Sequence, residues 1–287
     1  QLLCNHGLSE YHHTGDYEGA QTDFSRALAI ARSHADHRLE LRTLSNAAHV
    51  AADHYRWPDA LEKALETVQL GQHVPEPFFE VMAQEAASHA LRATGDFAAA
   101  SRHAQAALAP AEKLRVRRWL RFALGVNIEA AFARGDWPAM RALSERDDNV
   151  ETLMHRALLE YELGDSSQGR AWLERLLHSR VWASTGSGIR ALAALGIFQI
   201  ARVADVADQL GIAEGIAQDI LSSPIPRFAM LARTALALLA VQQSDAEAAV
   251  EYYAVLETLR RTLLPHSLIT NDRLLGLLAQ TMGNLDK

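Results

Sequence analysis

Apolar residues recur along most of the chain at the 3.6-residue spacing of an amphipathic helix, in paired runs separated by short turns. One run is FFEVMAQEAASHALRAT at 78–94, and AAASRHAQAALAPAEKL at 98–114 follows it directly. Ala and Leu dominate the apolar residues, whereas Gly, Pro and β-branched residues are few, and this composition favours helices over strands. The pattern therefore predicts an all-α chain built from pairs of antiparallel helices.

The turn between paired runs repeats along the chain. It is written TGDYEGA at 14–20, TGDFAAA at 94–100, ARGDWPAM at 133–140 and ELGDSSQG at 162–169. Aligning the turns before residue 150 gives a period of 40 residues, as expected of a repeat array, and after residue 150 the spacing shortens. The aligned turn residues are Gly15, Tyr55, Gly95 and Gly135, and two positions later stands an aromatic column of Tyr17, Trp57, Phe97 and Trp137. Further turns are predicted at Gly164-Asp165, Ser244-Asp245 and Gly283-Asn284, with a less clear repeat between Gly188 and Ser223.

Each residue type in the turn has a physical role. Glycine allows the left-handed conformation that ends a helix, and the neighbouring Asp can cap the next one. Pro58 and Pro138 fall in the first turn of the second helix, where a missing N–H costs nothing. The small residues Ala20, Ala60 and Ala100 let the two helices approach closely. The motif thus predicts the tight turn of a helical hairpin.

This pattern resembles the tetratricopeptide repeat. The first unit carries the residues of the family pattern at Tyr11, Gly15, Tyr17, Ala20, Phe24 and Ala27, and the last carries its Leu-Gly pair as Leu275-Gly276. The early tryptophan of that pattern is absent, with Cys4 in its place in the first unit, and the period exceeds the usual 34 residues. The resemblance implies a right-handed superhelical solenoid (an α-α superhelix). We expect one such array over 1–287, with about seven hairpins and a truncated eighth, as a fragment of a longer multidomain protein.

Composition and motifs exclude several functions. The net charge of −7 disfavours a direct contact with nucleic acid. The sequence contains no phosphate-binding G-x-x-x-x-G-K-[ST], no H-E-x-x-H, no C-x-x-C and no serine- or thiol-nucleophile signature. We therefore expect that the protein is not an enzyme, with no catalytic residue, no metal site and no cofactor. One cysteine and no long apolar run predict a cytoplasmic protein without a membrane span.

Repeat proteins commonly bind ligands on the concave face, formed by the first helix of each hairpin. Counting back from each turn places His49, His89 and Glu129 in a ladder along that face. The candidate binding residues are Arg42, His49, Glu85, His89, Arg92, Phe122, Glu129 and Phe132. One interpretation is that these side chains are hydrated and pair with one another. In the other, Arg42 and Arg92 clamp an anion, the histidines donate hydrogen bonds and Phe122 or Phe132 provides an apolar floor.

Three functions follow. By resemblance to the C-terminal sensor regions of large bacterial regulatory ATPases, found in LuxR-type transcriptional regulators and ATPase-linked nucleotide cyclases, the array is a non-catalytic sensor domain that binds a protein, a peptide or a small-molecule inducer. The alternative is a free-standing adaptor for a peptide segment of a partner protein. The third is an enzyme that uses Glu85 and Glu129 as paired carboxylates, which an open groove disfavours because nothing there would raise a carboxyl pKa.

Overall fold

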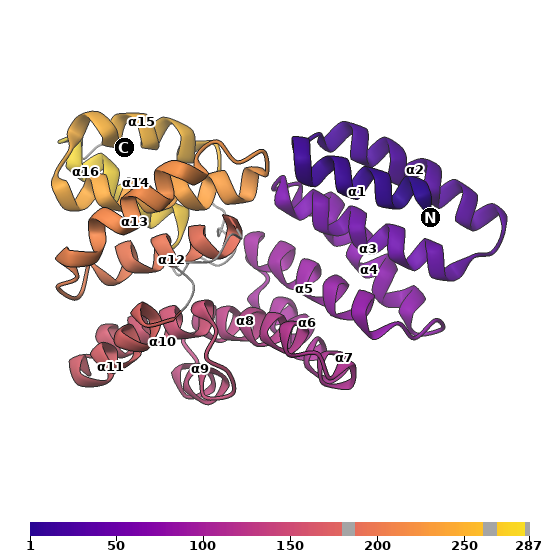
Figure 1. Cartoon of the computed structure of the whole chain (residues 1–287), viewed down its shortest axis with the longest axis horizontal. Coiled ribbons are helices and arrows are strands. Elements are labelled where there is room, and N and C mark those ends of the chain that lie inside the picture. Colours follow the sequence, from indigo (N-terminus) through magenta and orange to yellow (C-terminus); the bar gives the residue numbers. More distant parts are fainter. Residues whose placement is uncertain (180–186, 261–268, 285–287) are drawn as a thin grey trace. The chain divides into compact units, whose positions relative to one another are not determined.

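The computed structural model describes residues 1–179, 187–260 and 269–284. Over these residues the chain forms helices α1 to α16 and no β-strand, so the predicted all-α class is confirmed (Figure 1). The contacts divide the chain into two compact units. Unit 1 comprises Gln1–Ala130 with Pro224–Arg227, and unit 2 comprises Ala131–Ser223 with Phe228–Lys287. The sequence predicts one continuous array, and we describe each unit by itself.

Unit 1 is a series of helical hairpins. Its helices are α1 (Leu2–Thr14), α2 (Tyr17–Ser33), α3 (His37–Asp53), α4 (Trp57–Gly71), α5 (Pro77–Ala93), α6 (Phe97–Ala106), α7 (Leu108–Leu114) and most of α8 (Arg117–Ala133). From α1 to α7 each helix packs on the next, and α1 with α3 and α3 with α5 also pack directly. First helices of successive hairpins are therefore neighbours in space, as a repeat array requires.

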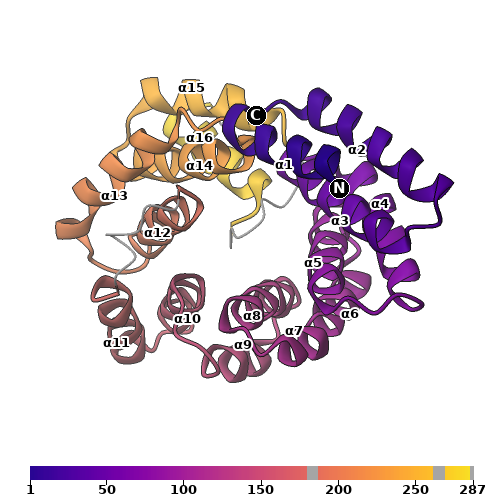
Figure 2. The same cartoon turned by 45° about the vertical axis from the view of Figure 1, so that its right-hand side comes forward.

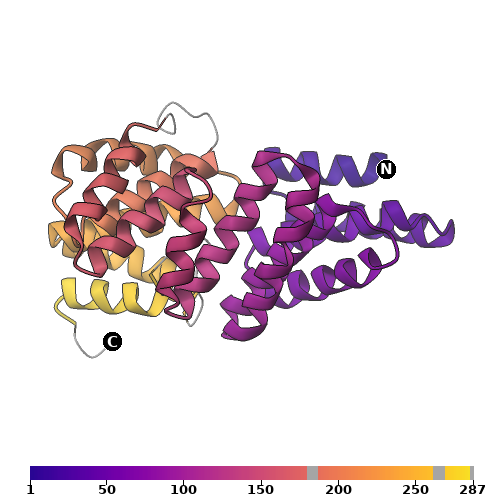
Figure 3. The same ribbon diagram turned by 90° about the horizontal axis from the view of Figure 1, so that it is seen from below.

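Unit 2 continues the alternation of first and second helices. It holds α9 (Trp137–Ser144), α10 (Val150–Glu162), α11 (Ser166–Leu177), α12 (Ser187–Ile200), α13 (Ala207–Ile220), most of α14 (Pro226–Gln243), α15 (Ala246–Glu257) and α16 (Asn271–Thr281). The pairs α10–α11, α12–α13 and α15–α16 pack closely, and α10 also packs on α12 (Figures 2 and 3). The end of the predicted eighth hairpin, residues 285–287, lies outside the described residues.

The predicted turns have the expected backbone. The turn glycines are left-handed, with φ of +73° at Gly15, +92° at Gly95, +70° at Gly135, +85° at Gly164 and +70° at Gly283. Where glycine is missing the conformation persists, at Tyr55 with φ +60° and at Ser244 with φ +56°. A positive φ is unfavourable for a residue with a side chain. The backbone of the hairpin turn is thus the same at Tyr55 and Ser244, although neither residue is a glycine.

The predicted caps are also confirmed. In five repeats an Asp side chain accepts a hydrogen bond of 2.9–3.2 Å from the backbone N–H three residues later, and these caps are Asp16, Asp96, Asp136, Asp165 and Asp245. In the turn at Tyr55, Arg56 occupies this place and forms no side-chain cap, and Pro58 follows it in the first turn of the helix. Capping of this kind typically stabilises a helix by about 1 kcal/mol.

The predicted helix over 98–114 is interrupted. α6 ends at Ala106 and α7 begins at Leu108, with Ala107 in a turn between them. Pro110 lies in α7 and cannot donate a backbone hydrogen bond, and its ring crowds the carbonyl four residues earlier. The break therefore falls at the point where a proline disrupts the ladder of helical hydrogen bonds.

Small buried residues bring the helices together. Ala20, Ala60 and Ala100 are at most 3% exposed, as the close approach of paired helices predicts. The aromatic column is less uniform, because Trp57 is buried whereas Phe97 is 37% exposed. Cys4 is buried with a free thiol, and the Nδ2 of Asn46 donates to its Sγ over 3.3 Å. Alanine at helix contacts, rather than the aromatic residues alone, therefore sets the spacing of the hairpins.

Candidate functional site

Four of the predicted site residues form a buried polar cluster in unit 1. Glu85, His89 and Arg92 lie on α5 and Glu129 lies on α8, and none is more than 4% exposed. Nδ1 of His89 is 3.5 Å from Oε1 of Glu85, and Nε2 of His89 is 3.4 Å from Oε2 of Glu129. Arg92 forms an ion pair with Glu129. The sequence predicts that His89 and Glu129 are neighbours. The structure places these two residues, with Glu85 and Arg92, in the interior rather than in a hydrated groove.

The other two polar candidates have different partners. Nη2 of Arg42 donates to Oδ1 of Asn5 over 2.7 Å, and Arg42 is partly exposed. Nε2 of His49 lies 3.9 Å from Oδ2 of Asp53, one turn along the same helix. Asp53 is buried and has two further partners. Its Oδ1 lies 3.0 Å from Nε of Arg227, and its Oδ2 accepts a 3.3 Å hydrogen bond from the hydroxyl of Tyr11. Burial and the Asp53 charge both raise the pKa of Tyr11 well above its ordinary value.

The two aromatic candidates separate. Phe122 packs in unit 1 against a cluster that includes Val81 and Ala123, with the ring of Trp119 at 5.9 Å in a T-shaped arrangement. Phe132 belongs to unit 2 and lines a pocket there. Among the described residues no group of three or more His, Cys, Asp or Glu is arranged to hold a metal ion.

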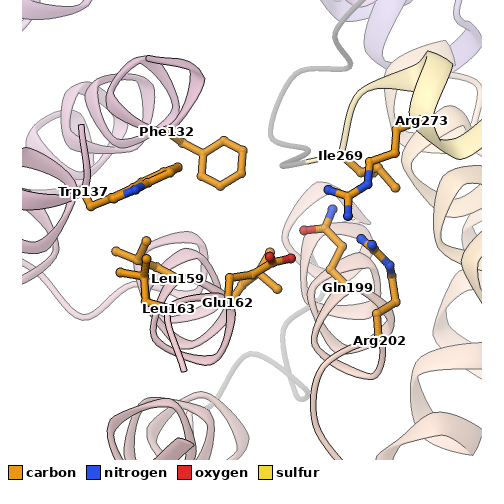
Figure 4. A pocket seen from close by; sticks show the side chains of 10 residues that line it. Phe132, Trp137, Leu159, Glu162, Leu163, Gln199, Arg202, Ile269 and Arg273 are labelled. Atoms are coloured by element: carbon orange, nitrogen blue, oxygen red, sulfur yellow. The ribbon is translucent and has the colours of Figure 1, made fainter. Parts of the chain in front are cut away.

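The pocket in unit 2 has a volume of about 240 Å³ and combines aromatic, aliphatic and charged walls (Figure 4). Its lining residues are Phe132, Trp137, Leu158, Leu159, Glu162, Leu163, Gln199, Arg202, Ile269 and Arg273. Figure 4 shows Phe132 and Trp137 on one side and the side chains of Gln199, Arg202 and Arg273 gathered on the other. The ring centroids of Phe132 and Trp137 are 5.6 Å apart at an angle of 57°.

Helix ends position these side chains. Phe132 and Trp137 flank the left-handed turn at Gly135, where Asp136 caps α9. Glu162 is the last residue of α10, and Arg202 lies in the turn that follows α12. Thr270 caps α16 by accepting from the backbone N–H of Arg273 over 3.2 Å. The pocket is therefore assembled from the ends of α8, α9, α10, α12 and α16 and the residues beside them, where side chains can project beyond the packed core.

The charges in the pocket are unbalanced. Partial burial lowers the pKa of Arg202, and the nearby positive charge of Arg273 lowers it further, whereas Glu162 opposes this shift. Within the described part of the chain, neither guanidinium forms an ion pair or a hydrogen bond. Arg273 is close enough to Arg202 to lower its pKa, and neither arginine forms an ion pair with a described carboxylate. Such a pair of guanidinium groups is suited to bind an anionic ligand.

Of the residues that line this pocket, the sequence pattern predicts only Phe132 as a site residue, and Trp137 belongs to the aromatic column. Arg202 lies in the stretch with the less clear repeat, and Arg273 is two residues before the Leu275-Gly276 pair. Arg202 stands at no counted position before a clear turn, whereas Arg273 stands ten residues before the predicted turn at Gly283, as Glu85 does before Gly95. The signal for Arg273 was this spacing, and both arginines lie at helix ends, Arg202 after α12 and Arg273 in the first turn of α16.

Comparison with family models, with curated proteins and with solved structures finds no match for this chain. In the described residues, no helix is long and apolar enough to cross a membrane.

Proposed function

We propose that this protein is a non-catalytic binding scaffold, in which tetratricopeptide-like hairpins stack into a right-handed superhelical solenoid. The recurrent left-handed elbows, the Asp caps and the direct packing of α1 on α3, α3 on α5 and α10 on α12 support this reading. Repeats of this kind present extended surfaces for proteins, peptides or small molecules.

The observation that carries the proposal is the pocket of unit 2. It places two guanidinium groups opposite two aromatic rings, within a wall of leucine and isoleucine side chains. A mostly apolar pocket with a few convergent polar groups is the usual form of a ligand site. The polar groups of this pocket are Gln199, Arg202, Arg273 and Glu162. Glu162 is the one carboxylate among the described lining residues, so positive charge predominates.

The buried cluster of unit 1 favours binding over catalysis. Glu85 is 2% exposed and Glu129 is 1% exposed, and each lies close to His89. A substrate would have to displace these internal contacts to reach either carboxylate. We therefore assign this cluster to the stability of the α5–α8 interface.

In the cell, we infer that the scaffold is the sensor or interaction domain of a bacterial signal-transduction or transcriptional regulator, and that it acts in the cytoplasm. The resemblance to the sensor arrays of LuxR-type and cyclase-linked ATPases supports this assignment. A bound inducer or protein partner would shift such a regulator between states only by binding one state more tightly. The alternative is a free-standing adaptor that holds a peptide segment of a partner.

Binding can be tested with the full chain. We would measure its melting temperature, by circular dichroism, against a panel of organic acids, amino acids, sugar phosphates and acidic peptides. A ligand that binds the folded state raises the melting temperature, and the rise increases with the logarithm of its concentration relative to its dissociation constant. Each stabilising compound is then recovered and quantified. Stabilisation without consumption supports a binding scaffold, whereas consumption of the compound, or no stabilisation by any class in the panel, contradicts it.

A further inference from the structure

The size of the unit 2 pocket restricts its guest. Sites for drug-sized ligands usually measure ~300–1,000 Å³. The pocket measures about 240 Å³, so it accommodates a smaller molecule or one projecting group of a larger one. A metabolite of the size of a single amino acid matches this volume better than a nucleotide does.

The charge of the pocket restricts the guest further. Arg202 and Arg273 contribute two positive charges and Glu162 one negative charge, which leaves a net charge of +1 among the lining residues. A monoanion neutralises this charge. A phosphate monoester, which carries ~1.5–2 negative charges at neutral pH, would overcompensate it. A zwitterion would leave it unbalanced. Planar guanidinium groups also match the geometry of a carboxylate.

The opposite wall is apolar. Phe132 and Trp137 face the arginines across the pocket with Leu159 and Leu163 near them, whereas Ile269 lies beside Arg273 (Figure 4). Leu158 also lines the pocket. Leu158, Leu159 and Ile269 are each at most 3% exposed, so they form a fixed surface. A purely polar anion would leave this wall without a partner, and an apolar group attached to the carboxylate would cover it.

We propose that this pocket binds a small organic monocarboxylate with an aromatic or branched aliphatic body. Its carboxylate lies between Arg202 and Arg273, and its body packs on Phe132 and Trp137. This inference rests on the proposed function, since it names the ligand class of the same binding scaffold.

Isothermal titration of the full chain tests the inference with defined probes. The probes are phenylacetate, its neutral counterpart phenylacetamide, acetate, phenyl phosphate and phenylalanine. We expect phenylacetate to bind most tightly. Acetate lacks the apolar body and phenylacetamide lacks the charge, so each should bind at least about tenfold more weakly.

Three substitutions locate the site. Arg202→Gln and Arg273→Gln should each weaken phenylacetate binding by about tenfold or more, because each removes a charge-assisted hydrogen bond. Glu162→Gln should strengthen it, because a nearby negative charge is removed. Arg170→Gln, an exposed arginine of α11 in the same unit, is the matched control and should leave binding unchanged. Equal melting temperatures show that the variants are folded.

The outcomes separate the inference from the proposed function. Equal binding of phenylacetate and phenylacetamide, tighter binding of phenyl phosphate or phenylalanine, or binding that survives Arg202→Gln and Arg273→Gln would overturn the monocarboxylate assignment. In those cases a binding scaffold still stands, with another ligand class or another site. If none of the five probes binds, the monocarboxylate assignment fails, and the proposed function then depends on the wider panel of compounds.

Discussion

Nε2 of His89 on α5 lies 3.4 Å from Oε2 of Glu129 on α8, so the first helices of two successive hairpins are joined by a contact between ionisable side chains. Arg92 pairs with the same carboxylate, and Glu85 lies on the other side of the imidazole. All four residues are buried. A buried charge network costs desolvation energy, and it is tolerated only while each member retains its partners.

Removing one member of this network should destabilise unit 1 severely. Arg92→Met takes the guanidinium away from the buried carboxylate of Glu129, and we expect a loss of about 3–5 kcal/mol in the free energy of unfolding. Replacing both residues, as Arg92→Met with Glu129→Leu, should cost much less than the sum of the two single changes. Urea titration followed by circular dichroism measures this coupling.

Arg42→Met is the control for that experiment, because Arg42 is a partly exposed arginine of the same unit that donates a hydrogen bond to neutral Asn5. Its loss should cost no more than about 1 kcal/mol. If Arg92→Met is as mild as Arg42→Met, the cluster does not hold α5 against α8.

The turn residues allow a separate test of backbone strain. Gly95 has φ +92° and a Cβ added there would meet nothing within 4 Å, so Gly95→Ala should cost about 1 kcal/mol or more through the backbone alone. Gly211 lies within α13, is also free of neighbours, and has an exposed position, so Gly211→Ala should instead stabilise by up to about 1 kcal/mol. Ser244→Gly should relieve the strained φ of +56° and raise stability. Melting temperatures that move in the same direction for Gly95→Ala and Gly211→Ala would refute this account.

The elbows could be predicted to the residue because their chemistry is local: a left-handed residue, an Asp cap and a small residue recur at fixed spacing. The same spacing correctly aligned His89 with Glu129. Burial of that pair could not be predicted, because it depends on how closely neighbouring hairpins pack. The unit 2 pocket was mostly missed, since Arg202 comes from the repeat with the least clear turn, and its approach to Arg273 depends on tertiary structure.

Packing between α10 and α12 should be sensitive to a single methyl group. A Cβ on Gly196 would lie 2.3 Å from Sδ and 2.4 Å from Cγ of Met154, which is fully buried. We expect Gly196→Ala to destabilise unit 2 by about 1–3 kcal/mol through overpacking. Adding Met154→Ala should recover part of this loss, because the methyl group then has room. Thermal unfolding of the two single variants and the double variant measures whether the two substitutions are coupled. If their effects on stability simply add, the added methyl group and Met154 do not clash directly.

The stability of unit 2 should depend on pH through Glu160. Nε of Arg141 lies 2.9 Å from Oε1 of Glu160, and Nε of Arg156 lies 2.6 Å from the same oxygen. The hydrogen bond from Arg141 is the main cause that holds the pKa of Glu160 below its ordinary value of 4.5; burial opposes it, and Arg156 adds to it. A carboxyl with a lowered pKa in the folded state stabilises the protein above its unfolded pKa, and this contribution is lost as the pH falls through the folded value.

Glu160→Gln should therefore lower the urea midpoint at pH 7. The difference from the unmodified protein should shrink as the pH falls below about 4.5, because protonation removes the same charge from the unmodified protein. Glu174→Gln, at an exposed position on α11, is the control and should change little at either pH. A difference for Glu160→Gln that stays constant from pH 7 to pH 3 would show that the carboxylate charge does not stabilise the fold.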